Sequence, residues 1–164
     1  MWVLAALTFA ATCPADTTGE RRADLDRAIE AYVNPFGVAY DRRNARIGWA
    51  DVSGDGHEDA LVLLHGPGWC GSSGCTLLVA EAMVHPEDAA EWGPFRIAAE
   101  VSNVNPPVHV ARRRGAWHDL VATDGFGALR VLRFTGETYP LSPADGRLLL
   151  GAKPPGVTLF VDAR

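Results

Sequence analysis

The sequence has few of the residues that common catalytic sites require. It contains only three cysteines and five histidines among 164 residues, and no histidine pair has a metal-ligand spacing such as H-E-x-x-H. Neither Ser72 nor Ser73 lies in the G-x-S-x-G context of a nucleophile elbow. The net charge of −5 argues against a general nucleic-acid partner. We therefore expect a protein that is not an enzyme, and we assign no catalytic residue.

The sequence also lacks an apolar run long enough to span a bilayer as a helix. The N-terminal run, residues 2–11, has the length of the apolar region of a secretory signal and is followed by small residues, although no Lys or Arg precedes it. We expect a signal peptide over residues 1–15 and one globular domain over residues 16–164. Two alternatives are a lipoprotein leader that ends before Cys13, which would anchor the chain to a membrane by lipid, and a cytosolic chain with an apolar first turn.

The cysteine count supports export. Without Cys13, only Cys70 and Cys75 remain, and an even number of cysteines in an exported chain indicates a disulfide. The C-x4-C spacing is not the redox C-x-x-C, and no second pair completes a zinc site. This disulfide would close the tip of a hairpin. It would either only stabilise the hairpin or make it a rigid element that binds a protein partner. The alternative to a disulfide is a free, reduced pair of cysteines. The candidate partner-binding residues are Trp69, Gly71, Ser72, Ser73 and Gly74.

Oxygen-bearing side chains alternate in the segment D-V-S-G-D-G-H-E-D. They occupy positions 1, 3, 5 and 9 of a loop with glycine at position 6, as in loops that surround calcium. Position 12 is Val62 rather than glutamate, so the segment is not an EF-hand. Asp, Ser and Gly also favour an ordinary turn, and both interpretations stay open. The candidate calcium ligands are Asp51, Ser53, Asp55, the carbonyl oxygen of His57, and Asp59.

Hydrophobic periodicity predicts an α+β fold. A capping box, Thr17 with Glu20, precedes apolar residues in a helical pattern, which indicates one amphipathic helix over about residues 18–33. Short apolar runs separated by turn residues then predict a mainly antiparallel sheet, either single or a partly closed sandwich or barrel. Residues 60–64 are apolar throughout, so this strand should be covered on both faces. The other expected strands are 47–50, 76–80, 95–101, 108–111, 119–123, 129–134 and 157–161.

Two family resemblances rest on these motifs. The acidic loop is similar to the D-x-[DNS]-x-D-G-x-x-D calcium loops of FG-GAP propeller repeats, but it occurs once, so the propeller fold does not carry over. About residues 45–143 resemble small bacterial exported proteins with D-x-N-G-D-G-x-x-E-A, W-C-G-S-G-G-C-T, P-P-[IV], G-W-x-D-L and Y-P-x-x-P elements. Here Ser53, Asp59 and Ala116 replace the usual Asn, Glu and Gly. The matching positions are Asp51, Ser53, Asp55, Asp59, Trp69, Cys70, Cys75, Trp117, Asp119, Tyr139 and Pro140.

The resemblance to small exported proteins implies export and a single fold but no mechanism. We expect a periplasmic or secreted, non-enzymatic binding module of the bacterial envelope, stabilised by calcium if the acidic loop binds it. The alternative is an inhibitor of a lysozyme-like hydrolase that acts through the Cys70–Cys75 tip. Periplasmic inhibitors of vertebrate-type lysozyme also present a C-x4-C loop, although the similarity ends at that spacing. An enzyme of unknown type is the third hypothesis.

Overall fold

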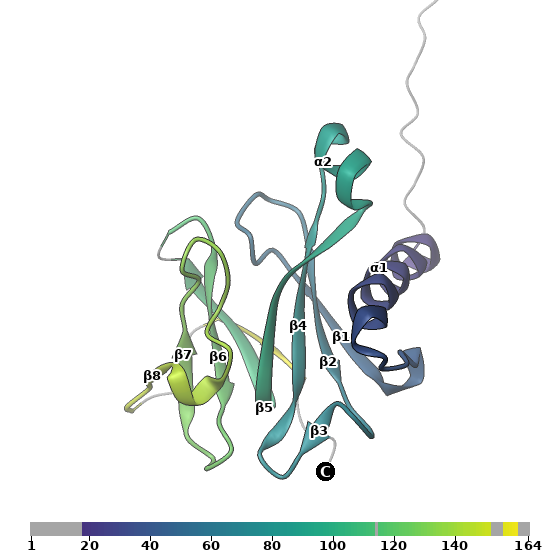
Figure 1. Ribbon diagram of the computed structural model, residues 1–164. Helices are drawn as coiled ribbons and strands as arrows, with labels where there is room; N and C mark the ends of the chain where they lie inside the picture. Colours follow the sequence, from purple (N-terminus) through teal and green to yellow (C-terminus); the bar gives the residue numbers. More distant parts are fainter. Residues whose placement is uncertain (1–17, 114, 152–155, 161–164) are drawn as a thin grey trace, which may run out of the picture.

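The structure is a computed structural model, which describes residues 18–113, 115–151 and 156–160. The expected leader with Cys13, and Thr17 of the capping box, lie outside these residues. The described chain has an α+β fold with a nine-stranded, antiparallel sheet and an N-terminal helix (Figure 1). The sheet is not closed, and the predicted fold class is confirmed.

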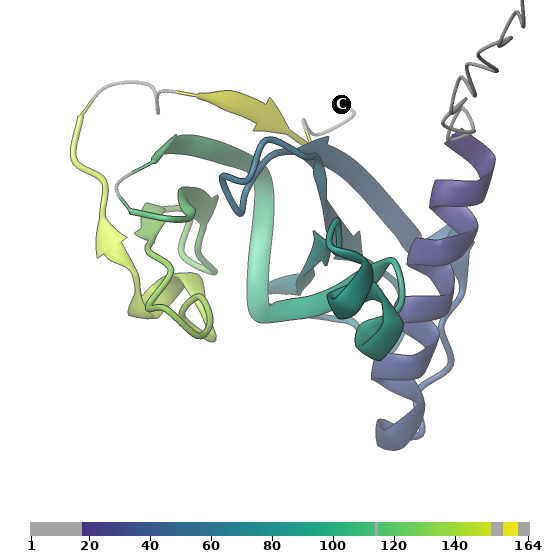
Figure 2. The ribbon, with the colours of Figure 1, turned by 90° about the horizontal axis from the view of Figure 1, so that it is seen from above.

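The N-terminal helix, α1 (Thr18–Val33), has the predicted bounds. Its apolar face is buried: Leu25, Ile29 and Val33 are at most 2% exposed and pack against one face of the sheet. Gly37, with a left-handed φ of 69°, ends the short 3-10 helix that follows. Figure 2 shows α1 lying along one side of the molecule, on the opposite side from β6 to β8.

The sheet has the order β1-β2-β4-β5-β6-β7-β8, with β3 paired to β4 and β9 paired to β5. Most strands join sequence neighbours, as short hairpins predict. The strands are β1 (Ala45–Ala50), β2 (Asp59–Leu64), β3 (Cys70–Gly71), β4 (Gly74–Ala82), β5 (Phe95–Arg113), β6 (His118–Thr123), β7 (Leu129–Leu132), β8 (Arg147–Leu148) and β9 (Val157–Leu159).

Strand β2 separates two groups of core residues, and every residue in it is buried. Because side chains alternate along a strand, one set, Ala60, Val62 and Leu64, packs with helix α1. The other set, Leu61 and Leu63, packs with residues of β5, β6 and β7. The prediction that this strand is covered on both faces is confirmed.

Strand β5 connects the two halves of the sheet. Val104 pairs with Cys75 of β4, whereas the next residue, Asn105, pairs with Thr123 of β6. The strand therefore leaves the first half of the sheet at one residue and enters the second half at the next. Figure 2 shows that β5 is strongly bent along its length. The sequence predicted two strands here, 95–101 and 108–111. That separation is wrong, because proline is compatible with extended backbone where ladder pairing is irregular.

A second helix, α2 (Pro86–Trp92), was missed by the prediction of a single helix. Proline at its start and Glu87 and Asp88 in its first turn are the usual signals of a helix N-terminus. The helix is only seven residues long, too short for a clear 3.6-residue periodicity. Local capping chemistry, rather than hydrophobic pattern, would have identified it.

Candidate functional site

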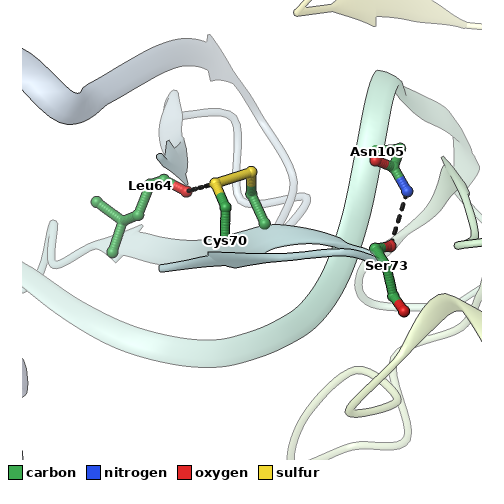
Figure 3. Close-up of a disulfide and its surroundings, with 5 residues drawn as sticks. Leu64, Cys70, Ser73 and Asn105 are labelled. Carbon is green, nitrogen blue, oxygen red and sulfur yellow. Dashed lines mark hydrogen bonds between the residues drawn. A yellow bond between two sulfur atoms is a disulfide. The ribbon is translucent and has the colours of Figure 1, made fainter. Parts of the chain in front are cut away.

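The two cysteines form the predicted disulfide at the end of a hairpin. Cys70 and Cys75 are directly opposite in the β3–β4 pair, with Gly71 opposite Gly74. The sulfur of Cys70 also lies 3.8 Å from the carbonyl oxygen of Leu64 (Figure 3). An oxidised sulfur has no proton to donate, so we treat this as a packing contact. The disulfide therefore fixes the shape of the tip, defined here as residues 70–75.

The candidate binding residues of the tip differ in their exposure. Trp69 is half-buried and packs with the core residues beneath α1. Gly74 is buried, and a Cβ atom there would lie 2.6 Å from the carbonyl carbon of Asn103. These two residues therefore position the tip rather than present a surface. The candidates that face solvent are Gly71, Ser72 and Ser73.

The tip is attached to the rest of the sheet through Asn105, which occupies the bend of β5. Its side-chain amide donates to the carbonyl oxygen of Ser73 at 2.9 Å and to that of Asp124 at 3.2 Å (Figure 3 shows the first bond). Gly125 packs against the same serine, since a Cβ at this glycine would lie 3.0 Å from Ser73 Cβ. One amide thus holds together two turns that are about fifty residues apart in sequence.

The second turn, residues 124–128, is organised by the buried carboxylate of Asp124. This group accepts hydrogen bonds from the amides of Phe126 and Ala128, each at 2.9 Å, and from Nε of Arg130 at 2.8 Å. The bond from Ala128 and the Arg130 guanidinium hold the pKa of Asp124 below its ordinary value. The turn exposes Phe126 almost completely, at 94%. Gly125 and Gly127 mark a loop in the sequence, but no functional residue was predicted in it.

The acidic loop between β1 and β2 uses its carboxylates to bind backbone amides. Asp51 accepts from the amides of Gly54 and Gly56, at 2.7 and 3.1 Å. Asp55 accepts from the amide of His57 at 2.8 Å. Such bonds are typical of Asx-type turns, so these two side chains stabilise the loop in which they lie.

The third carboxylate, that of Asp59, points into the protein and is fully buried. It accepts hydrogen bonds from the amides of Val52 and Ser53 at 2.8 and 2.7 Å, and from Ala82 of β4 at 2.9 Å. Burial raises the pKa of Asp59, and the three amide bonds oppose that shift. The buried Ser53 hydroxyl is near enough to lower the same pKa but meets no partner in hydrogen-bond geometry. Asp59 therefore ties the loop to the end of β4.

The candidate calcium ligands do not fit a cage of converging oxygens in this arrangement. Within the described part of the chain, no three His, Cys, Asp or Glu side chains gather as a metal site would require. Both oxygens of Asp51 and both of Asp59 are already bonded to amides. The geometry is that of a hydrogen-bonded turn, and calcium binding stays a prediction.

The aromatic positions of the family resemblance belong to the core. Trp117 stacks on Phe134 with ring centroids 4.1 Å apart, and Tyr139 packs edge-on against both rings. The hydroxyl of Tyr139 donates to the carbonyl oxygen of His118. Burial raises the pKa of Tyr139 far above its ordinary value, so the phenol stays protonated. These residues stabilise the second half of the sheet.

Comparison of the chain with family models, curated proteins and solved structures finds no match. The resemblance to small exported proteins therefore stays a prediction. Among the described residues, no helix is both long and apolar enough to cross a membrane.

Proposed function

We propose that this protein is an exported, non-enzymatic module that binds a protein partner through its disulfide tip. One observation carries the proposal: the tip is held by a disulfide and by the Asn105 amide, yet Gly71, Ser72 and Ser73 face solvent. A loop that is ordered before binding loses less conformational entropy on association. An exposed hairpin that is held by its own disulfide and by the Asn105 side chain is therefore suited to binding a protein partner.

The disulfide supports export, because such bonds form and persist in oxidising compartments. The proposed location is periplasmic or secreted, with lipid attachment at Cys13 as the alternative. We expect the intact mass of native material to correspond to a chain that begins after Ala15, or at a lipidated Cys13, with Cys70 and Cys75 oxidised. A full-length chain with free thiols would contradict export.

Placement of a photo-crosslinking residue tests the binding role of the tip. We expect p-benzoylphenylalanine at Ser72 to form a discrete protein adduct in the cells that produce the protein. The matched control is the same residue at the exposed position Glu87 of α2, which should form no such adduct. Equal adduct patterns at the two positions, or none at Ser72 in folded protein, would contradict the proposal.

Inhibition of a lysozyme-like hydrolase is the second candidate. It is favoured because the tip forms one end of the molecule (Figure 1) and its exposed residues are small and uncharged, so it could enter a narrow cleft. The expected result is that stoichiometric protein lowers the turnover of at least one enzyme in a lysozyme panel, and that Ser72→Arg restores it. Unchanged turnover throughout the panel would leave only the general binding role.

Calcium is retained as an alternative role for the acidic loop, supported by the spacing of its oxygen-bearing residues. A bound ion would have to compete with the amides that Asp51 now binds. For this reason the proposed function does not depend on a metal.

A further inference from the structure

The most exposed large apolar side chain among the described residues is that of Phe126, at 94%. Isolated exposed apolar residues are common and need no explanation by themselves. This phenylalanine differs because its own amide is bonded to the Asp124 carboxylate, which is anchored by Arg130. The amide of Gly127 also donates to the Asp124 carbonyl oxygen. The backbone beneath the ring is therefore fixed.

The turn of residues 124–128, called here the Phe126 turn, lies directly beside the disulfide tip. Asn105 donates to the carbonyl oxygens of both Ser73 and Asp124, and a Cβ atom at Gly125 would lie only 3.0 Å from Ser73 Cβ. In Figure 1 the β3–β4 hairpin and the β6–β7 turn occupy the same end of the molecule. We call their exposed residues the two-turn ridge, which comprises Gly71, Ser72, Ser73, Gly125, Phe126 and Gly127.

The composition of the two-turn ridge restricts the kind of partner. None of its residues is charged, and the nearby Asp124 carboxylate is buried and paired with Arg130. Phosphates of nucleic acids and anionic headgroups would find no cation on the ridge. An exposed phenyl ring on a turn next to the one that exposes Ser72 and Ser73 instead matches an apolar pocket with hydrogen-bonding groups at its rim.

We propose that Phe126 is the anchor by which the two-turn ridge binds a folded protein partner, its ring entering an apolar pocket while Ser72 and Ser73 form hydrogen bonds at the rim. This inference rests on the proposed binding role of the tip and adds the residue that supplies most of the affinity. Removal of a buried aromatic anchor costs about thirtyfold or more in affinity. Because the ring is exposed in the free protein, its removal should leave the fold intact.

The test uses the Ser72 crosslinker as the reporter. We expect Phe126→Ala to reduce the yield of the Ser72 protein adduct by at least about tenfold at unchanged melting temperature. The matched control, Phe36→Ala, removes another exposed ring, 68% exposed, near the end of α1 and should leave the yield unchanged. The crosslinker placed at Phe126 itself should capture the same protein as at Ser72.

Other outcomes would contradict the anchor role of Phe126, the binding role of the tip or the kind of partner. A Ser72 adduct that is unaffected by Phe126→Ala overturns the anchor but leaves the binding role of the tip. No protein adduct at either position overturns both. Adducts of the Phe126 crosslinker with lipid alone, or with a second copy of this chain, overturn the choice of a folded partner protein.

Discussion

Two buried aspartates, Asp59 and Asp124, accept hydrogen bonds from backbone amides. Asp59 links the β1–β2 loop to Ala82 of β4, whereas Asp124 closes the turn that exposes Phe126. Their pKa values shift in opposite directions, because burial dominates at Asp59 while amide and guanidinium contacts dominate at Asp124. At the residue scale, one buried carboxylate can therefore organise a loop by accepting hydrogen bonds from several backbone amides.

The lowered pKa of Asp124 predicts how its turn responds to acid. A carboxylate with a lowered folded-state pKa stabilises the protein fully above its unfolded value, about 3.9, and loses this contribution as the pH falls through the folded value. We expect the amide NMR signals of Phe126 and Ala128 to titrate together with a midpoint below about 3.9. Asp124→Asn should remove that titration, and a midpoint at or above this value would contradict the assignment.

At the element scale, the helix and strand β2 follow from local sequence patterns. The spacing of Leu25, Ile29 and Val33 indicated the helix, because a helix must bury its apolar stripe, and the capping box placed its start. The continuous apolar run of β2 gave a strand covered on both faces. The same reasoning wrongly divided β5 into strands 95–101 and 108–111, because the residues between them have no continuous apolar pattern and their pairing partners cannot be read from the sequence.

The packing of α1 predicts that alanine substitutions at two neighbouring positions change the free energy of unfolding by very different amounts. Leu25→Ala should lower the free energy of unfolding by about 2–5 kcal/mol, since it leaves a cavity beneath the helix. Arg27→Ala is the control, because that side chain is 69% exposed and its ion pair with Asp24 lies at the surface. Urea unfolding measures both changes. Equal effects for the two variants would mean that α1 is not docked on the sheet as described.

At the scale of the whole molecule, the bend of β5 determines which loops meet. Because Val104 pairs with one half of the sheet and Asn105 with the other, the tip and the Phe126 turn lie at one end of the fold (Figure 1). The acidic loop is tied separately, by Asp59, to the far end of β4. The ridge and the acidic loop are therefore independent features of the molecule.

The response of the whole fold to calcium distinguishes the two interpretations of the acidic loop. An ion bound at about 0.1 mM would add about 1.4 kcal/mol to the free energy of unfolding at about 1 mM calcium. Because Asp51 and Asp59 already bind amides, we expect equal melting temperatures in calcium and in EDTA. A gap of several degrees that Asp51→Ala abolishes would instead support the calcium loop.

The sequence by itself determined the features that depend on neighbouring residues. These are the helix, the apolar strand, the turn chemistry of the acidic loop and the disulfide between Cys70 and Cys75, all of which arise from spacings of a few residues. Only the tertiary structure decided that Asp59 would turn inward to Ala82 and that Asn105 would join Ser73 to Asp124. Such contacts depend on which distant strands pair, and local periodicity carries no information about that pairing.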